Sequence, residues 1–420
     1  MRVLFTTYPE RTIFQPMVPL AWALRTAGHD VRVASQPSFA GEITQAGLTA
    51  VPIGRQHTNT LRRLAEANPE LAEAERVGLP SPYDAAAPGE QPITFDRMVS
   101  GYRNVLEIWH KQNNFPLITG LVEFARQWEP DLIIWEPHTY AGPIAAKACG
   151  AAHGRLLWSV DIFGVTRERF LDLKPDQGPD PLADWLGSYG RRYGFEFSED
   201  MATGQFSIDP LPESIRLDSG LDKLPMRYVP YNGAAVAPSW LRTPPAKPRV
   251  ALTLGTSATE IFTGYTVSVQ DILDALAGLD VEIVATVAES KQGELERVPD
   301  GTRLVSYVPL HDLAPTCSVI VNHAGPGTVL TTAVNATPQL TMPYEFDEPE
   351  LARQVAQRGA ALTVVGDQDA GRGIRDNVLR LLSEPSFAAD AAGLAAEMAA
   401  LPSPNELVEP LEQLATKYRA

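Results

Sequence analysis

The chain alternates strand-like and helix-like segments in two separate sets, and this alternation constrains its fold more than any other feature. The first set reads as strand, helix, strand, helix and strand, at residues 2–7, 16–27, 30–35, 37–46 and 48–53. Short apolar runs joined by segments of helical period indicate buried parallel strands and crossover helices. This set therefore predicts one half of a doubly wound α/β domain.

The alternation stops between Gly54 and Gln112, where the chain is polar and interrupted by prolines. In an α/β domain a long excursion of this kind is usually a binding loop or a small helical insert. Order returns as helix, strand, helix and strand at residues 113–128, 130–135, 139–150 and 153–159. The excursion is expected to contribute to ligand binding, and the later segments are expected to extend the first sheet.

Prolines from Pro238 to Pro248 mark a linker, and a second alternating set follows it. Its strands are expected at residues 249–254, 281–286, 302–308, 317–322, 339–342 and 361–365, and its helices at 267–279, 327–335 and 348–357. We predict an α/β protein with two facing, Rossmann-like, doubly wound parallel-sheet domains, residues 1–237 and 249–404, joined by the linker 238–248. The ligand is expected in the interdomain cleft. The amphipathic segment 405–418 is expected to pack back onto the first domain.

Composition and charge exclude several classes of function. Hydrophobic residues make up 44% and charged residues 20% of the 420 residues, as in an ordinary globular protein. The formal charge of −16 argues against nucleic-acid binding and against broad attachment to anionic lipid. No apolar run approaches the ~20 residues of a membrane span, so we expect a cytoplasmic protein without stable membrane insertion. Cys149 and Cys317 lack metal-ligand spacing and are expected to be buried, reduced thiols.

The most informative stretch for chemistry is a glycine-rich run that follows a strand-like segment and opens a helix-like one. Its residues are His323, Ala324, Gly325, Pro326, Gly327 and Thr328. Such a turn lets backbone N–H groups approach an anion, and the helix dipole favours negative charge there. The spacing matches neither a dinucleotide fingerprint nor a lysine-containing P-loop, and a plain turn would also need glycine. Because His323 adds a side-chain donor, a diphosphate is the expected ligand.

Several blocks of the sequence resemble the nucleotide-sugar-dependent glycosyltransferases of the GT-B fold, in particular the bacterial ones that attach deoxysugars to polyketides. These blocks are Met1–Thr7, Val18–Arg25, Ala27–His29, Trp135–Pro137, Asp161, Met226–Val229 and Tyr231–Gly233. They are most similar to the desosaminyl- and forosaminyl-type branch, and the resemblance covers most of the chain. It implies a dTDP-sugar donor and binding of the donor diphosphate by the run around His323.

The resemblance also implies further donor contacts. They involve Gly255, Thr256 and Ser257 after the strand 249–254, and Tyr307, Val308 and Pro309 around the nucleobase. A structural turn and a simple strand end are the alternatives at these two places. Asp347 and Glu348 fall at the donor-sugar position, where a carboxylate could otherwise cap a helix. Because the family usually has an amide at the second place, Glu348 points to a protonated amino group on the sugar.

The sequence departs from the family pattern at Ile13, where relatives commonly place a histidine that takes the proton of the acceptor hydroxyl. Isoleucine cannot transfer a proton, so a base must come from elsewhere, if one is used. Asp161, at the end of a first-domain strand, is the first candidate, followed by Glu10 and His138. Asp161 could equally be a capping or ion-paired carboxylate, and a lone histidine such as His138 is more often structural.

These features predict an inverting glycosyltransferase that moves a deoxysugar, and plausibly an aminodeoxysugar, from dTDP to a hydroxyl group of a polyketide or macrolide. His323 and the helix N-terminus would stabilise the departing diphosphate, so neither a metal ion nor another cofactor is expected. Because of Ile13, a catalytically silent sugar-nucleotide-binding partner protein is an alternative, and a sugar-nucleotide epimerase is a third. Relatives further suggest a homodimer and an auxiliary protein that resembles cytochrome P450.

Overall fold

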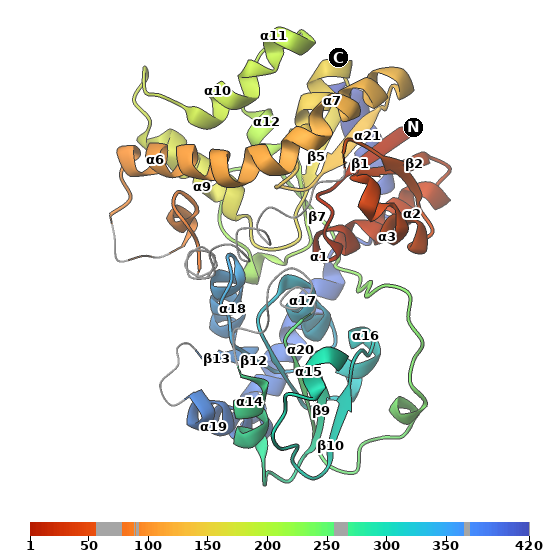
Figure 1. Cartoon of the computed structure of the whole chain (residues 1–420), viewed down its shortest axis with the longest axis vertical. Coiled ribbons are helices and arrows are strands. Elements are labelled where there is room, and N and C mark those ends of the chain that lie inside the picture. The colour runs from red at the N-terminus through yellow and green to blue at the C-terminus, as the bar shows by residue number, and fades with distance from the viewer. Residues whose placement is uncertain (56–77, 88, 90–91, 256–267, 365–369, 420) are drawn as a thin grey trace.

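The computed structural model describes residues 1–55, 78–87, 89, 92–255, 268–364 and 370–419. Figure 1 shows two lobes stacked along the long axis of the molecule, each built around one sheet. The first lobe takes its strands from residues 2–225, and the second takes its strands from residues 249–363. The strand pairing therefore confirms the predicted fold class, with two separate parallel sheets in one chain.

The sheet of the first lobe has seven parallel strands in the order β3-β2-β1-β4-β5-β6-β7. Their bounds are β1 (Arg2–Thr6), β2 (Asp30–Ser35), β3 (Thr49–Pro52), β4 (Leu132–Trp135), β5 (Ala152–Leu156), β6 (Ser207–Asp209) and β7 (Lys223–Pro225). Alternate residues of one strand enter different apolar clusters: Leu4 faces one cluster, and Val3 and Phe5 face the other. Both faces of the sheet are thus buried, which explains why its central strands β1 and β4 are almost wholly apolar.

Helices cover both faces of this sheet. They are α1 (Arg11–Phe14), α2 (Val18–Thr26), α3 (Ala40–Gln45), α6 (Phe95–Val105), α7 (Lys111–Trp128), α8 (Ala141–Cys149), α9 (Ile162–Leu173), α10 (Pro181–Ser188), α11 (Gly190–Tyr193) and α12 (Asp200–Thr203). A π-helical turn, η4 (Leu106–His110), joins α6 to α7. The excursion that interrupts the predicted alternation thus contains the long helix α6, as expected of a helical insert.

The sheet of the second lobe has six parallel strands in the order β10-β9-β8-β11-β12-β13. They are β8 (Arg249–Thr253), β9 (Glu282–Thr286), β10 (Thr302–Val305), β11 (Val319–Asn322), β12 (Gln339–Thr341) and β13 (Ala361–Thr363). The helices are α14 (Val269–Leu276), α15 (Glu289–Gln292), α16 (Leu310–Leu313), α17 (Pro326–Val334), α18 (Glu348–Gln357), α19 (Ala370–Ser383) and α20 (Pro385–Ala400). Every strand predicted for this set has a counterpart in the sheet.

The last helix returns to the first lobe. α21 (Val408–Tyr418) buries Leu411 and Ala415 in the apolar cluster that also contains Val3 and Phe5. In Figure 1 it lies beside β1 and β5, close to the N-terminus. None of the described helices is both long enough and apolar enough to cross a bilayer.

Two parts of the fold lie beyond the sequence predictions. The region between β5 and the linker contains β6, β7 and four helices, and the region after β13 contains α19 and α20. The strands β6 and β7 have three residues each, which is too few to show the alternating hydrophobic pattern of a strand. The two cysteines differ from the prediction in being only half-buried, although both are free thiols.

Candidate active site between the lobes

The strand order reverses at one point in each sheet, between β1 and β4 in the first lobe and between β8 and β11 in the second. In open α/β sheets ligands bind outside the carboxyl ends of the strands at such points. The loop after β1 carries Glu10, the loop after β4 carries His138, and those after β8 and β11 carry Gly255 and His323. The topology thus puts acceptor-side and donor-side candidates at the two switch points.

The ring of His323 is packed between two glycines. A Cβ atom added at Gly255 would lie 2.6 Å from His323 Cε1, and one added at Gly325 would lie 2.3 Å from His323 Nε2. Real Cβ atoms do not come that close, so a side chain at either position would displace the imidazole. Gly255 also has a φ of 72°, which glycine adopts without strain. These glycines therefore make room for the histidine.

A buried amide network holds the turn after His323. Ala324 has a left-handed φ of 70°, which is costly for a residue with a Cβ atom. Its N–H donates to Asn322 Oδ1 at 2.8 Å, and Asn322 Nδ2 donates to Gln339 Oε1 at 3.0 Å. Sequence reasoning missed Asn322 and Gln339. The available signal was an amide side chain at the end of one strand and at the start of the next, Asn322 in β11 and Gln339 in β12.

Helix α17 begins directly after this turn, with Gly325 as its N-cap residue and Pro326 at its first position. Proline fits there because the N–H that it lacks would have no partner inside the helix. A Cβ atom at Gly327 would meet nothing within 4 Å among the described residues. The predicted run from His323 to Thr328 thus forms a turn and a helix N-terminus directly after β11, which is suited to a diphosphate.

Glu348 and Asp347 lie at the start of α18, and both are buried. Glu348 Oε2 accepts the N–H groups of Tyr344 at 3.0 Å and Glu345 at 2.9 Å, and Glu348 Oε1 lies 3.6 Å from His323 Nε2. The carboxylate therefore caps the loop before its helix, and the prediction of a sugar contact stays open. Burial raises the pKa of Asp347 to about 6 and raises that of Glu348 well above its usual value.

The segment after β7 ties the first lobe to the donor side. Tyr228 Oη donates to the Gly327 carbonyl oxygen at 3.3 Å and lies 3.1 Å from Thr331 Oγ1, both on α17. The Asn232 carbonyl oxygen accepts from Tyr307 Oη at 2.6 Å. Val308 is buried and Tyr307 is half exposed beside this segment, and the contact of the backbone at Tyr307, Val308 and Pro309 with a nucleobase stays a prediction. Thr256 and Ser257, which were also predicted to contact the donor, lie outside the described residues.

Phe346 joins the donor loop to the acceptor side. It has a left-handed φ of 36°, and its ring lies 5.2 Å from Trp109, 5.6 Å from Phe163 and 6.4 Å from His138, measured between ring centroids. The π-helical turn η4 supplies Trp109, and π-helical turns are frequent at functional sites. An apolar, aromatic wall therefore lies next to the two donor-loop carboxylates.

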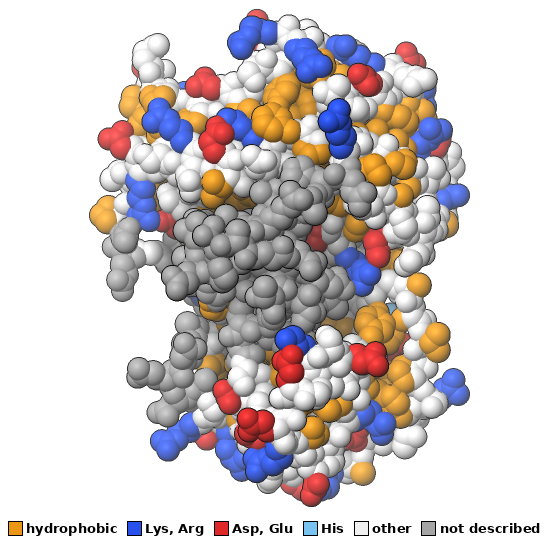
Figure 2. All heavy atoms as spheres, in the orientation of Figure 1, with side chains coloured by type: hydrophobic (Ala, Val, Ile, Leu, Met, Phe, Trp, Pro, Cys, Tyr) orange, Lys and Arg blue, Asp and Glu red, His pale blue; other side chains and the backbone are white. Residues whose placement is uncertain are grey.

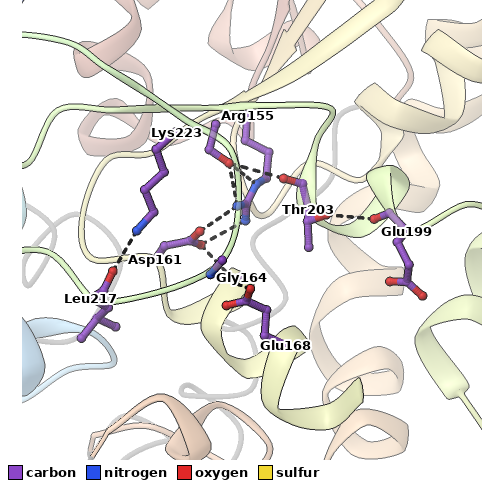
Figure 3. A network of polar contacts seen from close by, with 10 residues as sticks. Arg155, Asp161, Gly164, Glu168, Glu199, Thr203, Leu217 and Lys223 are labelled. Carbon is purple, nitrogen blue, oxygen red and sulfur yellow. Dashed lines mark hydrogen bonds and ion pairs between the residues drawn. The ribbon is translucent and has the colours of Figure 1, made fainter. Parts of the chain in front are cut away.

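The structure argues against Asp161 as the base, and this corrects the first choice made from the sequence. Asp161 accepts two hydrogen bonds from the guanidinium of Arg155, at 3.0 Å and 2.7 Å, and one from the Gly164 N–H at 2.9 Å (Figure 3). Its side chain is 1% exposed. A carboxylate that is buried, ion-paired and capping α9 cannot reach an acceptor hydroxyl. These contacts are the ones expected of the alternative, a capping or ion-paired carboxylate.

The other base candidates differ in accessibility. His138 Nε2 is buried without a hydrogen-bond partner among the described residues, and burial lowers the pKa of His138 to about 3. Glu10 is half-buried in the loop after β1 and accepts a hydrogen bond from Thr12 Oγ1 at 2.6 Å. Glu136 was not predicted as a site residue. Burial raises its pKa to about 7, and it accepts the N–H groups of Tyr8 at 3.0 Å and His138 at 2.7 Å.

Charge on the surface is mixed rather than gathered. On the face shown in Figure 2, basic and acidic side chains alternate over both lobes. Within the described ranges, no group of three or more His, Cys, Asp or Glu side chains could hold a metal ion.

Two facing Rossmann-like lobes, with a glycine-rich turn and a helix N-terminus after β11, have the architecture of the GT-B glycosyltransferases. The chain matches the family "Erythromycin biosynthesis protein CIII-like", with the N-terminal domain at residues 22–255 and the C-terminal domain at residues 270–414. It belongs to this family of glycosyltransferases.

Several characterised proteins are similar over the whole chain. The 10-deoxymethynolide desosaminyltransferase of Streptomyces venezuelae is 44% identical, over 100% of this chain and 98% of that protein. The solved glycosyltransferase VinC, in complex with dTDP, is 38% identical with a TM-score of 0.87, over 99% of this chain and 100% of VinC. The spinosyn forosaminyltransferase SpnP is 37% identical with a TM-score of 0.82, over 99% of each chain. At that identity SpnP is a homologue of this protein.

Proposed function

We propose that this protein transfers an aminodeoxysugar from dTDP to a hydroxyl group of a polyketide or macrolide, with inversion at the anomeric carbon. The desosaminyltransferase and the dTDP complex among its relatives support the sugar and nucleotide classes. The observation that carries the proposal is the His323 ring, held between Gly255 and Gly325 at the start of α17. There it lies beside the place where the negative charge of a leaving diphosphate develops.

We propose Glu10 as the base that deprotonates the acceptor. Asp161 is neutralised by Arg155, and burial makes His138 a weak base. Glu10 is partly exposed at the carboxyl end of β1, on the acceptor side of the switch point. A direct displacement needs a base on the face of the sugar opposite the leaving group, and the first lobe supplies that face. Glu136, buried behind the same loop, is the second candidate.

The test is His323→Ala, with dTDP binding and sugar transfer both measured. We expect weaker dTDP binding and a turnover lower by roughly 10²-fold, by analogy with the loss of one oxyanion donor. His29→Ala is the matched control, because His29 pairs with Glu412 in the other lobe. Unchanged dTDP affinity and turnover in His323→Ala would contradict the assignment.

Ile13 supports one alternative, a protein that binds the sugar nucleotide without catalysing transfer. Release of dTDP that requires a polyketide acceptor would identify a transferase and exclude a silent binding protein. A protein that binds dTDP-sugar tightly but never turns it over, with any member of an acceptor panel, would be the silent partner.

A further inference from the structure

Glu348 and His323 face each other in a fixed geometry at the donor site. The hydrogen bonds from the Tyr344 and Glu345 N–H groups hold Glu348 Oε2, and this directs Oε1 toward His323 Nε2 at 3.6 Å. Among the described residues, His323 is the one side chain able to carry positive charge within ion-pairing distance of Glu348. The His323 side chain keeps 19% of its surface exposed, so a ligand can reach the pair.

Without a ligand, the surroundings disfavour separated charges on this pair. Burial lowers the pKa of His323 to about 4, with the backbone of Thr253 acting in the opposite direction. Burial also raises the pKa of Glu348, and the carboxyl groups of Glu345 and Asp347 add to that shift. At neutral pH the imidazole is therefore neutral, and the shift at Glu348 favours the protonated form of its carboxyl group.

The described elements that pack most against α18 add no compensating charge to the pair. The turn η5 (Glu213–Ile215) packs on this helix, and its one titratable side chain, Glu213, is exposed and pairs with Arg216. Strand β13 also packs on α18 and has no titratable side chain. Within the part of the chain that the structure describes, the charge state of Glu348 is thus set by His323 and by its own loop, and a ligand that enters adds to them.

We propose that His323 and Glu348 share one proton, which rests on Glu348 in the empty site and passes to His323 when the donor diphosphate binds. The inference rests on the proposed function, because it takes the diphosphate site as given. In this step the Glu348 Oε1–H bond breaks and the His323 Nε2–H bond forms. The products are a carboxylate and an imidazolium, and no proton is exchanged with solvent.

The transfer also selects a class of donor. It turns a neutral pair into one positive group, which matches the diphosphate, and one negative group at the donor-sugar position. A sugar that carries an ammonium group pairs with that carboxylate, whereas a neutral sugar leaves it without a second partner in a buried place. The pair is therefore complementary to a zwitterionic donor, with an anionic diphosphate and a cationic sugar.

The test measures the protons taken up when dTDP binds. Calorimetric titrations at pH 7 in buffers of different ionisation enthalpy give this number directly. We expect almost no net uptake in the wild type, because the proton is internal. In Glu348→Gln we expect uptake of about one proton, because His323 must then take it from solvent. Glu350→Gln is the matched control: Glu350 is buried in the same helix but pairs with Arg353, and this variant should behave like the wild type.

Each outcome decides a different point. Uptake of about one proton by the wild type, or none by Glu348→Gln while it binds dTDP, would overturn proton sharing. Failure of the folded wild type to bind dTDP would instead overturn the proposed function. If Glu348→Gln does not fold, ¹⁵N NMR of the wild-type protein replaces the calorimetric test. The imidazole signal of His323 is assigned by its absence from the His323→Asn variant. The ring should change from neutral to protonated when dTDP is added at pH 7, and a ring that stays neutral would exclude the transfer.

Discussion

Arg155 and Asp161 form a bidentate ion pair at the carboxyl end of β5, with N–O distances of 3.0 Å and 2.7 Å and almost no exposure of either side chain. The guanidinium also donates to Ser207 Oγ on β6, so the pair ties β5, β6 and the start of α9 together. From the sequence alone, this carboxylate is predicted to be a catalytic base at a strand end. Its partners make it part of the framework of the first lobe.

Asp161→Asn should therefore lower stability rather than the chemical step. Removing one partner leaves the Arg155 charge buried, which typically costs about 3–5 kcal/mol in the free energy of unfolding. Urea unfolding measures this loss, and turnover per folded molecule should stay near the wild-type value. The double variant Arg155→Met with Asp161→Leu should recover much of the stability. A stable Asp161→Asn protein with turnover reduced 10²-fold or more would restore Asp161 as the base.

Gly255→Ala should disturb the donor site through His323. The new Cβ atom would lie 2.6 Å from the imidazole, at a φ of 72°, so the ring must move. We expect dTDP binding to weaken in the same direction as in His323→Ala, together with a stability loss of about 1 kcal/mol from the strained backbone. Gly293→Ala, where a Cβ atom meets nothing within 4 Å among the described residues, is the control. Equal dTDP affinity for both variants would contradict the packing argument.

Much of the framework of this site follows from sequence patterns. The predicted helix at 348–357 coincides with α18, and the predicted strand at 30–35 coincides with β2, because period and boundary signals agree there. The roles of buried polar residues do not follow in this way. Asp161 and Glu348 both stand at element ends, where a carboxylate can cap, pair or catalyse. Only the partners in space distinguish these roles. Arg155 is separated from Asp161 by a turn, and His323 is distant from Glu348 in the sequence.

Glu10→Gln tests the base directly. The substitution keeps the size of the side chain and its ability to accept from Thr12 Oγ1, but removes its basicity. We expect turnover to fall by roughly 10²- to 10⁴-fold, with dTDP affinity unchanged because the nucleotide binds the other lobe. Single-turnover rates and dTDP titrations measure the two quantities. A silent Glu10→Gln together with an impaired His138→Gln or Glu136→Gln would move the role to that residue.

His110 gives the protein a predictable sensitivity to acid. It is buried beside the hydroxyl group of Tyr83, and burial lowers its pKa to about 3. The unfolded chain binds a proton at this residue below pH ~6.5, whereas the folded chain stays unprotonated until pH ~3, so stability is lost as the pH falls between these values. This loss amounts to about 2 kcal/mol by pH 5.

The measurement is the cost of His110→Gln in the free energy of unfolding at pH 7 and at pH 5. That cost should shrink by about 2 kcal/mol at the lower pH, because the variant has no proton to bind in its unfolded state at this position. His311→Gln, a substitution at an exposed histidine, is the control. A cost for His110→Gln that is the same at both pH values would mean that the folded protein already protonates this ring.

Glu348→Gln should change which donor the enzyme prefers. A Gln side chain can still accept from the Tyr344 and Glu345 N–H groups, so the loop cap is largely kept while the negative charge is removed. With either donor, the variant lacks the proton that Glu348 would pass to His323, so this loss cancels in the ratio of the two specificity constants.

The contact with the sugar ammonium does not cancel, and it is worth roughly 1.5–3 kcal/mol if it is desolvated and ~1 kcal/mol or less if it is solvated. Specificity constants for a dTDP-aminodeoxysugar and a neutral dTDP-deoxysugar should therefore shift against the aminosugar by about tenfold or more. Parallel losses for the two donors would reduce Glu348 to a partner of His323 and a cap of its loop, and would remove the reason for preferring an aminosugar.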